Sequence, residues 1–94
     1  MILLIVSLVM RKLSKLVKKF LADPPEARFE DVRYVLEAFG FKEARSKGSH
    51  HTFENSQGEV IVIPKKGGKK VNRTYIKAIV DLLNLENWSG ESED

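Results

Sequence analysis

Cysteine is absent from this sequence of 94 residues, and histidine occurs only twice. Without cysteine there is no disulfide, no disulfide-linked partner, no thiolate nucleophile and no Cys-based zinc or iron site. Two histidines could hold a metal only with help from carboxylates, so we predict no metal site and no cofactor. A chain without cysteine is compatible with a reducing compartment, and we expect a cytoplasmic protein.

Long apolar runs and common enzyme motifs are missing as well. There is no Gly-rich phosphate loop, no nucleophile elbow and no zinc-protease motif. The run Met1–Met10, MILLIVSLVM, is about half of the roughly 20 apolar residues that a membrane-spanning helix needs. Positive charges follow this run, whereas they precede the apolar run of a secretory signal, so we do not expect export.

A chain of 94 residues with 43% hydrophobic residues predicts one small globular domain.

The charged residues of this chain are distributed in blocks of opposite sign. The formal net charge of +3 combines +5 over residues 1–20, −3 over residues 21–40, +6 over residues 41–80 and −5 over residues 81–94. A basic block between acidic segments indicates a polyanionic ligand better than the net charge does.

We assign residues 1–28 to an N-terminal helical extension. Apolar residues repeat there with the spacing of one helical face, and lysines lie on the other face. The apolar residues are Leu13, Leu16, Val17, Phe20 and Leu21. Pro24 and Pro25 predict that this helix ends at Asp23. The helix either packs on the domain, which we favour, or contacts an anionic membrane surface or a partner. Met10 is an alternative start of the natural chain.

Residues 29–88 are predicted to form an α+β domain. A helical period over residues 32–39 ends at Gly40, which suits a left-handed cap. Three strands follow, at residues 41–47, 50–54 and 60–63, and then a helix over residues 74–83 that Asn72 can cap. We expect a three-stranded antiparallel sheet with both helices on one face, preceded by the extra helix.

Three further features complete this prediction. Alternation along the first strand predicts that Glu43, Arg45 and Lys47 share one face. The stretch 65–70, with four lysines and two glycines, is predicted to be a mobile cationic loop. The acidic tail, residues 89–94, is predicted to be disordered.

His50 and His51 are the candidate acid–base residues. Histidine is the side chain that ordinarily titrates near neutral pH. Neighbouring residues on a strand point to opposite faces, so only one of the two histidines can serve as the acid–base residue of a given site. A histidine pair considered apart from its neighbours has a structural or surface role more often than a catalytic one. Gly48 permits close approach of a ligand and Ser49 can donate to a phosphate oxygen, which favours a functional role.

The segment Lys47-Gly48-Ser49-His50-His51 resembles the HicA family of toxins. The wider match includes Gly40-Phe41, Arg45, Phe53, the strand Val60–Pro64 and the Thr74–Leu83 helix, and it covers roughly residues 29–85. The resemblance implies a fold similar to the double-stranded RNA-binding domain, an mRNA-cleaving activity and an antitoxin partner of the HicB type. The family's catalytic histidine corresponds to His50, with His51 as the alternate. The chain departs from short members in its N-terminal extension and in having Lys65-Lys66 after Pro64.

The expected activity is metal-independent cleavage of mRNA. His50 would take a proton from a ribose 2′-hydroxyl, which then attacks the adjacent phosphate. The general acid is left open among His51, Lys47 and Tyr75. The predicted RNA-binding residues are Lys47, Gly48, Ser49, Lys65, Lys66, Lys69, Lys70, Arg73 and Lys77.

Two other functions remain as alternatives. The first is a non-catalytic module that binds double-stranded RNA, which would show salt-dependent binding without cleavage products. The second is a protein-interaction module that acts through the N-terminal helix, so that removing residues 1–22 would abolish its activity.

Overall fold

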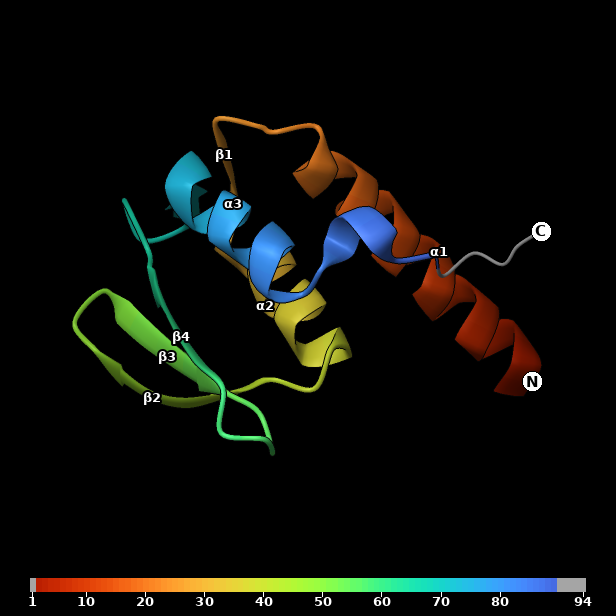
Figure 1. Ribbon diagram of the computed structural model, residues 1–94, viewed down its shortest axis with the longest axis horizontal. Helices are drawn as coiled ribbons and strands as arrows, with labels where there is room; N and C mark the ends of the chain where they lie inside the picture. The colour runs from red at the N-terminus through yellow and green to blue at the C-terminus, as the bar shows by residue number, and fades with distance from the viewer. Residues whose placement is uncertain (1, 90–94) are drawn as a thin grey trace.

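Three antiparallel strands form a sheet, and the helices lie on one side of it (Figure 1). The computed structural model describes residues 2–89. The elements, in chain order, are α1 (Ile2–Leu21), β1 (Glu26–Arg28), α2 (Phe29–Ala38), β2 (Lys42–Lys47), β3 (His50–Glu54), β4 (Val60–Pro64), β5 (Lys70–Asn72), α3 (Arg73–Leu82) and a 3-10 helix, η1 (Leu85–Asn87). This arrangement confirms the predicted α+β fold, is consistent with the α-β-β-β-α order of the double-stranded RNA-binding domain, and includes the extra N-terminal helix.

The sheet is the predicted meander, in the order β2-β3-β4. A second sheet of two short strands, β1 and β5, was not predicted; it pairs Ala27 with Val71. Strands of three residues are too short to show an alternating pattern, so pairing across more than 40 residues left no local signal. The β1–β5 pair ties the start of α2 to the start of α3.

A bulge in β2 corrects the prediction that Glu43, Arg45 and Lys47 share one face. Glu43 lies opposite Phe53, whereas Arg45 lies opposite Thr52, so the register shifts by one residue between them. An extra residue in one strand reverses the faces on either side of it. Glu43 therefore faces the helices, while Arg45 and Lys47 lie on the open face of the sheet.

One hydrophobic core joins the three α-helices to strands β3 and β4 of the sheet. The apolar faces of α2 and α3 supply Val32, Val35, Leu36, Ile76 and Ile79, all fully buried. The sheet supplies Phe53 and Ile63 to the same cluster. The helical period of these residues buries one face of each helix against the sheet.

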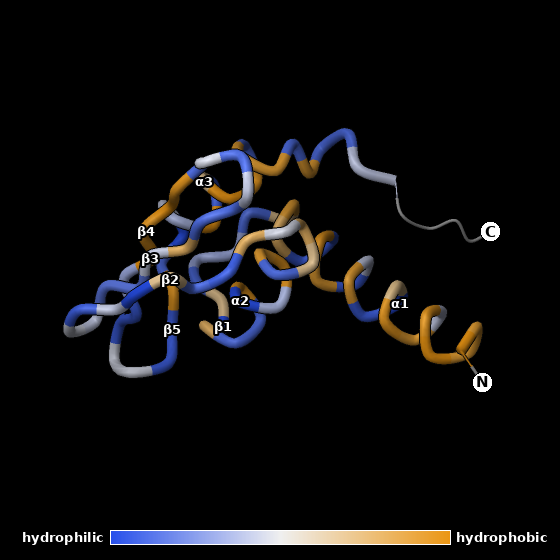
Figure 2. Tube along the Cα trace, turned by 90° about the horizontal axis from the view of Figure 1, so that it is seen from below, coloured by the Kyte–Doolittle hydropathy of each residue, from blue (hydrophilic) through white to orange (hydrophobic). Residues whose placement is uncertain are grey.

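α1 is longer than predicted. It begins at Ile2, where the sequence pattern predicted a helix only from residue 13, and ends at Leu21; Asp23 has a left-handed φ of 58°. Its C-terminal half buries Leu13, Leu16, Val17 and Phe20 in the shared core. Its N-terminal half extends beyond the core and is apolar (Figure 2). No helix within residues 2–89 is long and apolar enough to cross a membrane.

The remaining predictions concern chain ends and turns. Gly40 has the φ of 93° that a left-handed helix end requires, as predicted. Asn72 stands at the N-cap of α3, but its side chain makes no capping hydrogen bond. The stretch 65–70 contains a tight turn closed by a bridge between Lys66 and Lys70, and Lys70 begins β5. The predicted disordered tail lies, from residue 90 on, outside the described residues.

Candidate functional site

A two-residue hairpin turn brings His50 beside Lys47. β2 ends at Lys47, β3 begins at His50, and Gly48-Ser49 connects them. Gly48 has a φ of 60° at the first central position, as a type II′ hairpin turn requires. Lys47 and His50 are direct partners in the sheet register. Such partners share a face with Cβ atoms about 5 Å apart.

The His50 side chain is exposed on the open face of the sheet. Its partner on the other side is Pro64 of β4. Further along this face, the Arg45 guanidinium contacts the Glu54 carboxylate at 3.0 Å. A substrate that lies across the open face would therefore meet the histidine ring directly.

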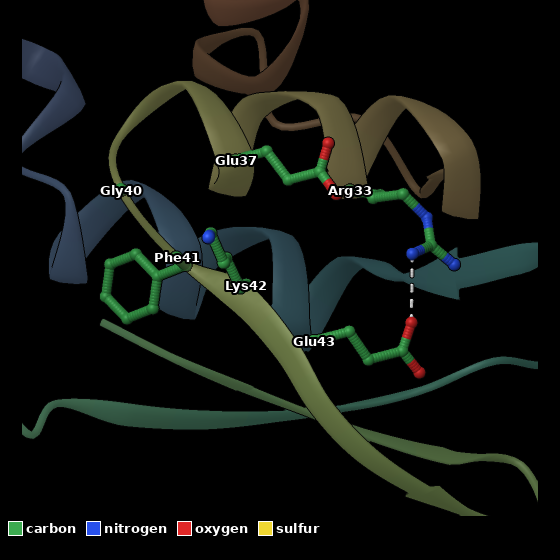
Figure 3. Close-up of a pocket in the computed structure, with 6 residues that line it drawn as sticks. All are labelled: Arg33, Glu37, Gly40, Phe41, Lys42 and Glu43. Atoms are coloured by element: carbon green, nitrogen blue, oxygen red, sulfur yellow. Dashed lines mark ion pairs between the residues drawn. The ribbon is translucent and has the colours of Figure 1, made fainter. Parts of the chain in front are cut away.

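His51 points to the opposite, helix-covered face. Its side chain is 13% exposed, and its Nδ1 lies 2.6 Å from Oε2 of Glu43. Its ring packs on Phe29 with centroids 4.6 Å apart. The other carboxylate oxygen of Glu43 accepts a contact of 2.9 Å from Arg33 Nη1 (Figure 3). The hydrogen bond from His51, with added attraction from the charges of His51 and Arg33, holds the pKa of Glu43 below its usual value despite partial burial.

Phe29, Arg33 and Glu43 were not predicted as site residues. The ring of Phe29 contacts three polar or charged side chains, those of His51, Arg33 and Lys65. The Arg33 guanidinium lies 5.1 Å and Lys65 Nζ 4.5 Å from its centroid. These residues come from α2, β2, β3 and the end of β4. No local pattern links them, because only the packing of α2 on the sheet brings them together.

Five of the nine predicted RNA-binding residues gather at the hairpin end of the sheet. They are Lys47, Gly48, Ser49, Lys65 and Lys66. The backbone N–H of Lys65 donates to the Ser49 carbonyl at 2.8 Å, which holds the end of β4 against the turn. The Lys65 ammonium points toward Phe29, so it lies on the face of His51 and not on that of His50.

The other four predicted RNA-binding residues follow along β5 and α3. Lys70 pairs with Glu26 at 2.7 Å, and Arg73 pairs with Asp23 at 3.5 Å. Lys69 and Lys77 are exposed. Exposed ion pairs of this kind contribute roughly 0–1 kcal/mol, so a phosphate could compete for either cation.

A separate pocket of about 430 Å³ opens between α2 and the start of β2. Its lining residues are Arg33, Glu37, Gly40, Phe41, Lys42 and Glu43 (Figure 3). It lies at the end of β2 opposite to Lys47, so it does not include His50. Among the described side chains, no three histidines, aspartates or glutamates come together as a metal site would require.

The family model for the HicA toxin of bacterial toxin-antitoxin systems matches residues 29–85, more than half of the chain. The chain belongs to the HicA toxin family. HicA toxins are known as mRNA interferases and pair with an antitoxin. The matched segment includes α2, the whole meander and α3, and excludes α1. No significant match was found among curated proteins or among solved structures.

Proposed function

We propose that this HicA protein is an endoribonuclease that cleaves mRNA with His50 as the general base. The observation that carries the proposal is the position of His50. It is exposed on the open sheet face and lies directly opposite Lys47 across a turn of two residues. A base must reach the proton that it removes, and the exposed ring can do so, whereas His51 is engaged with Glu43 on the covered face.

The reaction proposed is an internal transesterification. The His50 ring takes the proton of a ribose 2′-hydroxyl, and the 2′-oxygen forms a bond to the adjacent phosphorus. The bond from phosphorus to the 5′-oxygen of the next nucleotide breaks, and that oxygen takes up a proton. The products are a 2′,3′-cyclic phosphate and a free 5′-hydroxyl. DNA lacks the 2′-hydroxyl, so the substrate is RNA.

Lys47 is the best placed of the three nominated general acids. It shares the open face with His50, whereas His51 points to the covered face. Tyr75 belongs to α3, which packs with the core on the covered side of the sheet. The Lys47 ammonium can also neutralise the phosphate on which negative charge develops. The remaining lysines and Arg73 would hold the RNA backbone through phosphate contacts.

The deciding experiment compares two matched variants, His50→Gln and His51→Gln, on a structured RNA. We expect His50→Gln to lower the cleavage rate by at least 100-fold with an unchanged circular dichroism spectrum. His51→Gln should keep most of the activity, because it changes a ring on the covered face. An active His50→Gln protein, or loss only in a folded His51→Gln protein, would assign the chemistry to another group.

Two controls address the chemistry itself. RNA with 2′-O-methyl groups should not be cleaved, because it has no 2′-proton to remove. A chelator such as EDTA should leave the rate unchanged, since no step of the proposed reaction requires a metal; a large loss of rate would contradict that part.

The proposed partner is an antitoxin of the HicB type. Coexpression of such an antitoxin should restore the growth of cells in which the toxin alone arrests it. Salt-dependent binding to double-stranded RNA with no cleavage products would instead support the non-catalytic binding module.

A further inference from the structure

We propose that the N-terminal half of α1 inserts into one leaflet of a membrane that contains anionic phospholipids. This half comprises Ile2–Val9, and its seven large apolar side chains are between 47% and 84% exposed. Such a concentration of apolar surface on a small domain marks an interaction site. Figure 2 shows this segment projecting as an apolar rod from the rest of the molecule.

The distribution of these side chains favours lipid over a protein groove. Successive helical residues are rotated by about 100°, so the five consecutive apolar residues Ile2–Val6 surround the helix axis completely. A protein groove, or a second copy of the chain packed side by side, covers one stripe of a helix and leaves the others in water. Lipid chains cover every side at once. Ser7 is the single polar residue in this half.

The length of the segment suits one leaflet. Eight helical residues rise about 12 Å, and half of a hydrocarbon core of roughly 30 Å is about 15 Å. Tyr34 stands where the segment meets the domain: its hydroxyl donates to the Val9 carbonyl at 3.4 Å, and Lys12 Nζ lies 4.4 Å from its ring centroid. Tyrosine is typical of the depth at which a membrane meets water.

The charge of the next helical turns selects an anionic surface. Five exposed basic residues follow the apolar half, and α1 contains no acidic residue. They are Arg11, Lys12, Lys15, Lys18 and Lys19. Stable attachment of a short apolar anchor usually needs a second, electrostatic contribution, and this basic cluster supplies it.

Insertion of this segment would leave the open face of the sheet free. Leu13, Leu16, Val17 and Phe20 lock the second half of α1 into the core, so the helix and domain move as one body. The N-terminal end of α1 and the three-stranded sheet lie at opposite ends of the molecule (Figure 1). The open face with His50 would therefore stay in water, and the proposal does not depend on the activity proposed for that face.

The test is flotation of the full chain with vesicles of phosphatidylcholine alone or mixed with phosphatidylglycerol. We expect binding to the mixed vesicles, weaker binding to the neutral ones, and a decrease with added salt. Leu4→Glu and Val6→Glu lie about 200° apart around α1, and each should reduce binding at least tenfold. The control is Val60→Glu, because Val60 is 51% exposed and Val6 is 52% exposed; it should bind as the unaltered chain does.

Three outcomes would overturn the proposal. The first is no binding of the full chain to either kind of vesicle. The second is vesicle binding that only one of the two α1 substitutions reduces, which would indicate that α1 lies along the membrane surface on one face and does not insert. The third is a dimer in lipid-free buffer that either substitution dissociates, which would make a second copy the occupant. RNA cleavage measured on the same preparations reports on His50 separately.

Discussion

His50 and His51 are neighbours in the chain, yet the sheet separates them completely. The His50 ring is exposed beside Lys47, while the His51 ring packs on Phe29 and hydrogen-bonds to Glu43. Successive side chains on a strand point to opposite faces of the sheet, and this alone separates the two rings. The arrangement gives His50 an exposed position on the open face and His51 a largely buried, hydrogen-bonded position on the covered face.

The ion pair around Glu43 predicts a pH-dependent contribution to stability. Its pKa is lowered in the folded protein, so the folded state binds that proton less tightly than the unfolded chain. The stabilisation is present above the ordinary value of 4.5 and is lost as the pH falls through the lowered pKa. We expect Glu43→Gln to reduce the free energy of unfolding by about 1–2 kcal/mol at pH 7.

Urea unfolding of the two proteins at a series of pH values measures this difference. The curves should converge at low pH, because a protonated Glu43 resembles glutamine. A difference that stays constant from pH 7 to pH 2 would show that the charge of Glu43 is not the source of the effect.

At the scale of elements, the Gly48-Ser49 turn and the bulge in β2 together decide which side chains share the open face. The turn makes Lys47 the direct partner of His50, and the bulge returns Glu43 to the covered face. Without the bulge, Glu43 would lie on the face with Arg45 and Lys47, and a carboxylate there would repel a phosphate backbone. The bulge therefore keeps a second carboxylate off the open face, where Glu54 already pairs with Arg45.

Gly48→Ala tests the turn. No atom lies within 4 Å of a Cβ at this position, so the cost comes from the φ of 60° and not from a clash. We expect a loss of about 1–2 kcal/mol in stability. If the turn positions His50, RNA cleavage should also decrease under conditions where the variant remains folded. Gly58→Ala, with a φ of 83° in the next hairpin loop, is the matched control and should lose stability without a specific loss of cleavage.

At the scale of the whole molecule, α1 has two halves with opposite roles. The half from Leu13 to Phe20 packs into the same core as residues 29–85, the segment that matches the HicA family. The half from Ile2 to Val9 contributes no buried side chain to that core. Removing residues 1–22 would therefore uncover the core, and loss of activity in that deletion would not distinguish an interaction module from a nuclease.

A pair of changes in α1 separates the two halves. Phe20→Ala removes a side chain that is 1% exposed, and we expect a loss of about 3–5 kcal/mol in the free energy of unfolding. A chain that begins at Met10 should unfold at nearly the same urea concentration as the full chain and should keep its RNA cleavage. Equal destabilisation by both changes would contradict the division of α1.

Patterns within single elements were predictable from the sequence. The helical period before Gly40, the β-branched strand Val60–Pro64 and the Lys-Gly-Ser-His turn all lie within a few residues of chain, and their local physics suffices to predict α2, the meander and the HicA resemblance. The roles proposed for His50 and the RNA-binding lysines stay predictions.

Only the tertiary structure decided features that join distant segments. The β1–β5 pair, the cluster of Arg33, Glu43 and His51, and the burial of Phe20 against the HicA domain depend on which surfaces meet after the chain collapses. The bulge in β2 belongs here too, because its register is set by pairing with β3 and by the burial of Phe53. Local sequence determines the conformation of α2, the three strands of the meander and α3, whereas long-range burial and pairing form β1 and β5 and select the faces that the elements present.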